Sequence, residues 1–331
     1  MLTDKHLRSF HAKNVWTQQT LVFASSAFCL AVLCTSIYLL NNFQSREAVF
    51  VPTDPAFILL RSLNLFSGLD FHRALENGYQ APASQQRGEK ICVVMSDNRN
   101  FTAFSPKAKL SEVPYYQLSV YHHLLYAIRH GYDFRYVRAV PEEGYHVTWP
   151  KITVMLKLLE EGRHDLLVYM DADAYVTDTS LPFSTMFRSA GFKSYHSLML
   201  AQDPFEDANL SSQGVPNLNT GFIVARNTTA AKKTLQAVLA CPEQILECEY
   251  LKLHWPHEQG ALSSYVLPNL PKKTVLSAEC NFFNGNPNLS HCTGKYVSHL
   301  WFGKGDLNAI LIDDMASTLI HAVGASMSAY D

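Results

Sequence analysis

Two aspartates, Asp171 and Asp173, stand one residue apart in the sequence LLVYMDADAYV, directly after an apolar run. In an extended chain residues i and i+2 point to the same side, so both carboxylates would face one ligand. Paired anionic oxygens at a strand end suit Mg²⁺ or Mn²⁺, which take carboxylate and water ligands and bridge to a substrate's phosphates. The small side chain of Ala172 leaves room for that ligand. The motif therefore predicts a divalent-metal site for a phosphorylated substrate.

An Asp-x-Asp pattern by itself also occurs in solvated turns, so its context decides between the two readings. Residues 166–170 are continuously apolar, which is typical of a strand buried on both faces. Two acids at the end of such a strand would repel each other unless a cation lay between them. The context favours the metal site.

The elements expected to position this pair alternate between strands and helices. Strand-like runs occupy 90–96, 132–139, 166–170, 197–202 and 221–226. Helices are expected over 115–130, ended by Gly131, over 150–161, opened by Pro150 and ended by Gly162, and near 229–240 and 257–266. This order predicts a doubly wound α/β domain with a mostly parallel sheet, whose ligand lies at the carboxyl ends of the strands.

Several function classes lack their usual sequence signatures. The chain has neither the G-x-G-x-x-G fingerprint nor the P-loop pattern, which argues against dinucleotide redox chemistry and ATP hydrolysis. Its 27 Lys and Arg against 29 Asp and Glu give a net charge of −2, so no basic field is available to bind nucleic acid. Nucleic acid is therefore not an expected partner.

Residues 20–40 contain no charged side chain and are long enough to cross the roughly 30 Å apolar core of a bilayer as one helix. A cleaved signal peptide is the alternative, but its apolar region would span only about 7 to 15 residues. Lys5, Arg8 and Lys13 precede the segment, which places the N-terminus in the cytosol. We expect a single-pass type II protein of the Golgi or endoplasmic reticulum membrane.

This topology divides the chain into a cytosolic tail (1–19), a transmembrane anchor (20–40), a stem (41–88) and a lumenal catalytic domain (89–331). A fragment comprising residues 85–331 is expected to retain the catalytic fold, since the stem lacks patterned apolar runs. Four N-glycosylation sequons, at Asn100, Asn209, Asn227 and Asn288, agree with a lumenal domain.

Five cysteines lie in the lumenal part, where disulfides can persist. Short separations predict the pairs Cys241–Cys248 and Cys280–Cys292, although four cysteines allow three pairings. Cys92, inside an apolar strand, is expected to be a free buried thiol.

An ordered set of motifs resembles a known family. The succession WPKI from Trp149, YMDADAYV, LNTGFIVARN at 218–227 and HEQGAL at 257–262 is similar to the fungal galactosyl- and mannosyltransferases and the plant xyloglucan xylosyltransferases. These enzymes share the GT-A nucleotide-sugar fold, and the likeness covers about residues 90–305. Where the family commonly reads Ser-Trp-Ala-Lys, this chain has Thr-Trp-Pro-Lys, and its C-terminal segment is shorter.

The resemblance implies a metal site with three ligands. A late histidine completes the coordination in the family, and His299 in YVSHLWFGKG is the matching candidate beside Asp171 and Asp173. Neutral imidazole is a good ligand for ions such as Mn²⁺. Gly303 and Lys304 follow closely, as a flexible turn and a cation suited to a diphosphate.

The resemblance also implies contacts with the donor sugar nucleotide. At the end of the first strand, base and ribose would be bound by Ser96, Asp97 and Arg99, which could equally form an ordinary turn. Lys151 would neutralise phosphate. At the third motif, hydroxyls of the reacting sugar would be contacted by Asn219, Thr220 and Gly221, which are also common turn residues.

Asp203, Glu258 and Gln259 complete the site as the groups expected near the anomeric carbon, although Glu258 also suits a helix start. The implied reaction is metal-dependent transfer of a hexosyl or pentosyl group from a nucleoside diphosphate sugar to a glycan hydroxyl. Retention is expected, through front-face attack or a carboxylate nucleophile. The alternatives are a catalytically inactive lumenal protein that binds nucleotide sugars or glycans, and a metal-dependent hydrolase.

Overall fold

The computed structural model describes residues 77–86, 88–100, 110–289 and 291–328, all of which belong to a compact unit, Gly68–Asp331. The expected tail (1–19), anchor (20–40) and most of the stem (41–88) lie outside the described residues. Within the described ranges, no helix combines the length and the apolar character needed to cross a membrane.

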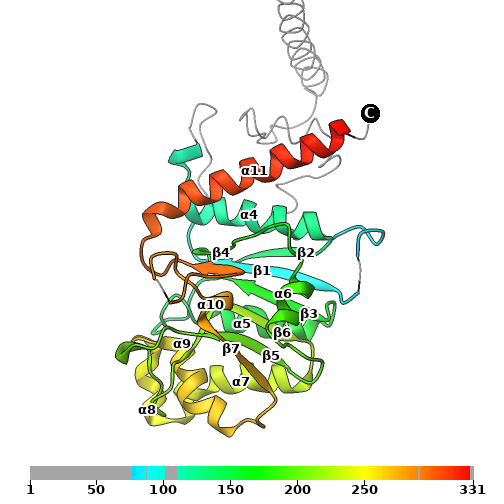
Figure 1. Cartoon of the computed structure of the whole chain (residues 1–331). Coiled ribbons are helices and arrows are strands. Elements are labelled where there is room, and N and C mark those ends of the chain that lie inside the picture. The colour runs from blue at the N-terminus through cyan, green and yellow to red at the C-terminus, as the bar shows by residue number, and fades with distance from the viewer. Residues whose placement is uncertain (1–76, 87, 101–109, 290, 329–331) are drawn as a thin grey trace, which may run out of the picture. The chain divides into compact units, whose positions relative to one another are not determined.

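A six-stranded sheet with the order β2-β1-β3-β6-β5-β7 forms the centre of the fold (Figure 1). Its strands are β1 (Ile91–Asp97), β2 (Asp133–Arg138), β3 (Leu166–Met170), β5 (Leu198–Gln202), β6 (Leu218–Arg226) and β7 (Val275–Ala278). β6 runs antiparallel to both of its neighbours, and the other pairings in this sheet are parallel. This reversal places the start of β6 at the same edge as the carboxyl ends of β1, β3 and β5.

Helices cover both faces of the sheet, which confirms the expected α/β fold with a mostly parallel sheet. Alternate β1 side chains point to opposite sides: Val93 and Met95 lie in a core with α4 and α6, and Cys92 and Val94 in a core with α5 and α7. The helices are α4 (Tyr115–His130), α5 (Pro150–Glu161), α6 (Phe183–Ser189) and α7 (Thr229–Gln244). Burial on both faces explains the continuous apolar run at 90–96.

The ends of two helices confirm the expected capping signals. Gly131 and Gly162 follow α4 and α5 with φ values of 67° and 69°, a left-handed conformation that favours glycine. Pro150 occupies the first turn of α5, where its missing N–H costs no hydrogen bond.

Several elements were not predicted, among them two short strands and one long helix. β4 (Ala174–Val176) and β8 (Val297–His299) form a separate antiparallel pair. α11 (Leu307–Ser328) runs alongside α4 (Figure 1), and Leu307 and Leu311 pack against Leu118. The predicted helix near 257–266 is present as α9 (His257–Gly260), which continues as a π-helix over Ala261–Val266. The other helices of the described residues are α8 (Leu246–Glu249) and α10 (Cys280–Phe283), with 3-10 turns at Leu110–Glu112, Asp207–Asn209, Tyr250–Lys252, Leu267–Asn269 and Lys304–Asp306.

Both predicted disulfides are confirmed, Cys241–Cys248 beside α8 and Cys280–Cys292 around the chain that follows α10. Cys92 is a free buried thiol, as predicted. Burial raises the pKa of the Cys92 thiol, so it is protonated and unreactive at neutral pH.

The last residues of the expected stem pair with β2. Tyr79 exchanges two backbone hydrogen bonds with Phe134, of 2.8 and 2.9 Å. The N–H of buried Ala81 donates to Asp133 Oδ1 at 2.8 Å, and His164 Nε2 lies 2.7 Å from Asp133 Oδ2. Burial alone would raise the pKa of the Asp133 carboxyl, but the bonds from His164 and Ala81 outweigh burial and lower it. Residues 79–81 therefore stabilise the amino end of the sheet.

A fragment that begins at residue 85 should be less stable than one that begins at residue 77. It lacks the pairing at Tyr79 and leaves the buried Asp133 without one donor, which costs about 1 to 3 kcal/mol of unfolding free energy, or roughly 2 to 10 °C in melting temperature. The difference in melting temperature is measured by circular dichroism for both fragments. Each fragment is measured with its natural sequence and again with Asp133→Asn. The substitution should cost more in the longer fragment, and equal melting temperatures for the two unsubstituted fragments would contradict the assignment.

Candidate functional site

The two aspartates of the DAD motif lie in a turn between β3 and β4. The Ala174 N–H donates to the Asp171 carbonyl at 3.0 Å, and the Asp171 N–H donates to the Gly221 carbonyl of β6 at 2.8 Å. The expectation that residues 171–173 are extended is therefore wrong. The turn brings the carboxylates toward one region because it reverses the chain between two paired strands.

β8 brings His299 to the same region. His299 pairs with Ala174 of β4, and its Nε2 lies 3.1 Å from Asp173 Oδ1. One ligand atom from each of Asp171, Asp173 and His299 lies within 4.8 Å of the other two. Two carboxylates and an imidazole form a donor set that fits a divalent cation such as Mn²⁺. The three predicted ligands thus meet although they are far apart in the sequence.

Each carboxylate of the pair contacts a lysine. Lys151 Nζ lies 2.7 Å from Asp171 Oδ2, and Lys304 Nζ lies 2.7 Å from Asp173 Oδ2. Burial alone would raise the pKa of the Asp173 carboxyl, but His299 and Lys304 outweigh burial and hold it well below its usual range. Lys151 is buried, yet Asp171 and Glu258 keep its pKa above the ordinary lysine value. Both lysines therefore carry positive charge beside the aspartates of the DAD turn.

A tyrosine that the sequence analysis missed links the end of β1 to the aspartates. Tyr169 donates its hydroxyl hydrogen to Asp171 Oδ1 at 3.0 Å, and its oxygen lies 3.0 Å from Ser96 Oγ. Because the hydroxyl has one hydrogen, Ser96 is the donor in the second bond. Tyr169 was hidden in an apolar run, but its i, i+2 spacing from Asp171 was an available signal.

Asp97 and Arg99 pair with each other at the carboxyl end of β1. Arg99 Nε donates to Asp97 Oδ1 at 2.8 Å, and Nη1 donates to the Tyr115 hydroxyl at 2.9 Å. The guanidinium also lies over the Tyr116 ring, 4.1 Å from its centroid. These contacts hold a planar cation and an aromatic ring beside the strand end.

Asp203, at the end of β5, accepts hydrogen bonds from three amide side chains. Asn219 and Asn284 donate to Oδ1 at 2.9 and 3.0 Å, and Gln259 donates to Oδ2 at 2.8 Å. Burial nevertheless raises the pKa of the Asp203 carboxyl above its usual value. Both of its oxygens are engaged within the protein.

Glu258, in α9, is buried and bound from two other elements. Its Oε1 accepts from Thr220 Oγ1 at 2.7 Å and lies 3.4 Å from Lys151 Nζ, and its Oε2 accepts from the Thr148 hydroxyl. Burial alone would raise the pKa of the Glu258 carboxyl, but Lys151 and the two threonines outweigh burial and lower it. Glu258 is therefore ionised and keeps buried Lys151 charged from a second side.

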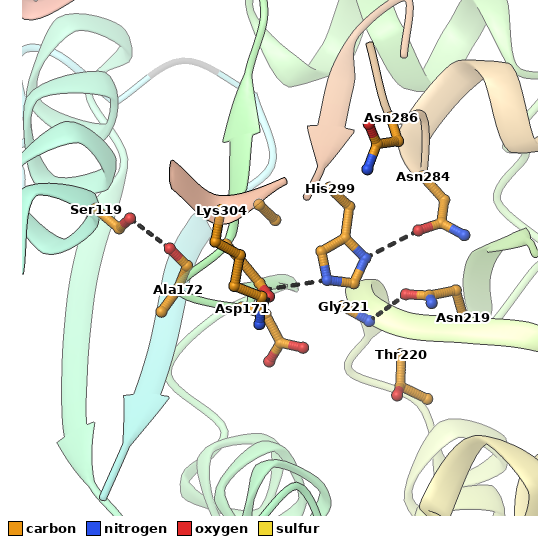
Figure 2. A network of polar contacts seen from close by, with 12 residues as sticks. Ser119, Asp171, Ala172, Asn219, Thr220, Gly221, Asn284, Asn286, His299 and Lys304 are labelled. Carbon is orange, nitrogen blue, oxygen red and sulfur yellow. Dashed lines mark hydrogen bonds and ion pairs between the residues drawn. The ribbon is translucent and has the colours of Figure 1, made fainter. Parts of the chain in front are cut away.

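Helix α4 supports the DAD turn from behind. Ser119 Oγ donates to the Ala172 carbonyl (Figure 2), and His123 Nε2 lies 2.9 Å from the Ala174 carbonyl. Burial lowers the pKa of His123 to about 3, so His123 is neutral and donates its Nε2 hydrogen to that carbonyl. The sequence analysis missed both residues, although polar side chains on the apolar side of a helix were a visible signal.

Two positions of the site require glycine, one for lack of space and one for its backbone conformation. A Cβ on Gly221 would lie 2.2 Å from Cε1 of His299, so only glycine fits beneath the imidazole. Gly303 has φ 73° and begins the turn that carries Lys304. The structure thus brings the predicted residues of the motifs to one edge of the sheet, together with the unpredicted Thr148, Tyr169 and Asn284.

The fold is similar to that of a solved glycosyltransferase. A glycosyltransferase involved in the glycosylation of the major capsid of PBCV-1 is 16% identical over 67% of this chain and 98% of that chain, with a TM-score of 0.50. GlyE of Streptococcus pneumoniae TIGR4 is 14% identical over 72% and 64%, with a TM-score of 0.44. The galactosyltransferase LgtC, solved with donor and acceptor sugar analogs, is 16% identical over 68% and 95%, with a TM-score of 0.41. At 16% identity, the similarity to the PBCV-1 glycosyltransferase shows a shared GT-A fold and nothing about activity. The other two TM-scores are too low to support an argument.

The sequence identifies the family directly. A comparison with curated protein sequences found no significant match. The sequence model of the galactosyl transferase GMA12/MNN10 family matches residues 88–275, which are more than half of the 331 residues. This range contains the DAD turn, the start of β6 and the α9 motif. The chain therefore belongs to the galactosyl transferase GMA12/MNN10 family and is a glycosyltransferase.

Proposed function

We propose that this glycosyltransferase holds a divalent cation, Mn²⁺ or Mg²⁺, with Asp171, Asp173 and His299 and uses it to bind a nucleoside diphosphate sugar. The observation that carries the proposal is the convergence of three ligand atoms within 4.8 Å of one another. The imidazole favours Mn²⁺ over Mg²⁺, which prefers oxygen donors. When bound, the cation acts as a Lewis acid on the leaving diphosphate.

The protein's own cations would complete the diphosphate site. Lys304 is 42% exposed and follows the Gly303 turn, so its ammonium can leave Asp173 and reach a phosphate. Lys151 is buried and stays between Asp171 and Glu258, where it offsets the negative charge of both. At the end of β1, Ser96, Asp97 and Arg99 are proposed to bind base and ribose, with Tyr116 and the guanidinium offering flat surfaces.

The transferred group would be a hexosyl or pentosyl residue and the acceptor a glycan hydroxyl, with retention at the anomeric carbon. Asp203 is occupied by three amides, and Glu258 by two hydroxyls and Lys151. A carboxylate engaged at both oxygens is a poor nucleophile, so these contacts favour front-face attack assisted by the departing phosphate. Asn219 then contributes by binding Asp203, and Thr220 by binding Glu258. Gly221 contributes by leaving space for the ring of His299.

We also propose that the enzyme acts in the lumen of the secretory pathway, on the Golgi or endoplasmic reticulum membrane, anchored by residues 20–40. Two disulfides in the described domain support an oxidising compartment.

Protease added to sealed microsomes containing the full chain should trim only the N-terminal tail until detergent is added. Degradation of residues 89–331 in sealed microsomes would place the domain on the cytosolic side.

Asp171→Asn and Asp173→Asn should each lower transfer by at least about 100-fold. Each removes a charged ligand but keeps its shape, so the cation that stabilises the leaving group is lost. The assay screens nucleotide sugars for release of nucleoside diphosphate, with and without Mn²⁺ and acceptor glycan.

Asp178→Asn, an exposed change in the next loop, is the control and should behave as wild type. A double variant that carries both Asp171→Asn and Asp173→Asn and retains wild-type, chelator-sensitive turnover would place the metal elsewhere. Release that acceptor does not stimulate would indicate a hydrolase, and binding without release an inactive protein.

Lys304→Gln should move two affinities in opposite directions. Without nucleotide, Asp173 no longer has the ammonium as a competitor, so Mn²⁺ should bind up to about 5-fold more tightly, the scale of a half-exposed ion pair. Nucleoside diphosphate should bind more weakly, because a phosphate contact is lost. Calorimetric titrations measure both, and Lys295→Gln removes the same charge from an exposed position nearby. Weaker Mn²⁺ binding in Lys304→Gln would refute the competition.

A further inference from the structure

The side chain of Asn284, the residue that ends α10, lies buried between β5 and His299 (Figure 2). Its Nδ2 lies 3.1 Å from the Gln202 carbonyl oxygen and 3.0 Å from Asp203 Oδ1. Its Oδ1 lies 2.9 Å from His299 Nδ1. A backbone carbonyl can only accept, so the amide nitrogen must face Gln202 whatever the charge of Asp203. The orientation of the amide is therefore determined by the backbone of β5.

This orientation decides where His299 carries its hydrogen. The Asn284 oxygen can only accept, so His299 Nδ1 must be protonated. The other ring nitrogen, Nε2, lies 3.1 Å from the carboxylate oxygen Asp173 Oδ1 and donates a hydrogen to it in the metal-free protein. A cation bound by Asp173 would replace that hydrogen, so Nε2 is the nitrogen left for the metal while Nδ1 keeps its hydrogen. We propose that Asn284 is a positioning residue that holds His299 in the tautomer able to bind a metal through Nε2. The inference rests on the metal site of the proposed function and adds a residue to it.

Asp203 is the anchor of this arrangement. It binds Asn284, which orients the imidazole, and it binds Asn219, whose Oδ1 accepts the Gly221 N–H at 2.7 Å. Gly221 packs against the ring of His299 so closely that a Cβ would overlap it. The imidazole is thus held at its Nδ1 edge and across one face by groups that both lead back to Asp203. Asp203 supports the ligand and does not attack the sugar.

When a metal-ligating histidine loses the hydrogen-bond partner of its other ring nitrogen, the metal affinity generally falls by about 10- to 100-fold. Without the Asn284 oxygen, the hydrogen of the neutral ring can occupy either nitrogen. A neutral ring whose hydrogen lies on Nε2 has no lone pair there for a cation, so part of the population would be unable to bind metal.

The test uses the full-length protein with ¹⁵N-labelled histidine, first without metal and then with diamagnetic Zn²⁺ as the probe. Nitrogen NMR, with the His299 signals assigned by their loss in His299→Gln, should show hydrogen on Nδ1 in both states, and Zn²⁺ should remove the hydrogen from Nε2. In Asn284→Ala a form without hydrogen on Nδ1 should appear. Calorimetric titration with Mn²⁺ should give affinity about 10- to 100-fold weaker for Asn284→Ala than for wild type.

Asn281→Ala is the matched control. Asn281 lies in α10 and its Oδ1 accepts the N–H groups of Thr293 and Gly294, so the change loosens the same segment without touching His299. It should leave both the tautomer and the Mn²⁺ affinity at their wild-type values. An equal loss of affinity in Asn281→Ala would reduce Asn284 to a general structural role and overturn the proposal.

The metal-free wild-type spectrum requires no variant to fold and no metal to bind, so it tests the inference separately from the proposed function. Absence of hydrogen from Nδ1 of His299 in that spectrum would overturn the role of Asn284. So would Asn284→Ala with wild-type Mn²⁺ affinity. Hydrogen on Nδ1 in a wild type that binds no Mn²⁺ would support the orienting contact while contradicting the metal-dependent function.

Discussion

Four carboxylates, those of Asp171, Asp173, Asp203 and Glu258, gather at one edge of the sheet, and the site depends on compensating this negative charge. A buried carboxylate is costly unless it is paired or hydrogen-bonded. Each acid meets a different set of partners, which are a lysine and a tyrosine for Asp171, an imidazole and a lysine for Asp173, three amides for Asp203, and a lysine with two threonines for Glu258. The partners come from most of the elements around this edge. Charge compensation therefore connects the strands, helices and loops into one site.

The reversed strand β6 makes this concentration possible. In a fully parallel sheet the start of a strand lies at the edge opposite to the ends of its neighbours. β6 runs the other way between β3 and β5, so Asn219, Thr220 and Gly221 lie beside Asp171 and Asp203. The backbone of β6 also accepts the N–H of Asp171 through Gly221. One strand thus supports both the aspartate turn and the anchor of the histidine.

Local patterns predicted the parts of the fold that local interactions determine. The helices α4 and α5 end where the chain takes a left-handed conformation, which glycine adopts easily, so the glycines predicted both ends. Both disulfides close short loops. Three-residue strands such as β4 and β8 carry no periodic signal, and the direction of β6 depends on packing across the sheet. The family resemblance placed His299 near the aspartates. It could not indicate Tyr169 or Asn284, because an apolar run concealed one and the role of the other arises only when β5, α10 and β8 meet.

The disulfide Cys280–Cys292 closes a loop that contains Asn284, so a covalent bond constrains the segment that contacts the imidazole of His299. β8 is held by β4 without it, and His299 would keep its backbone position in the reduced protein. The enclosed residues would then sample more conformations, at an entropic cost to each contact that Asn284 makes. A chain folded under reducing conditions can consequently have a native sheet and a poorly prepared imidazole. Formation of the Cys280–Cys292 bond would thus affect the order of the His299 imidazole separately from the folding of the sheet.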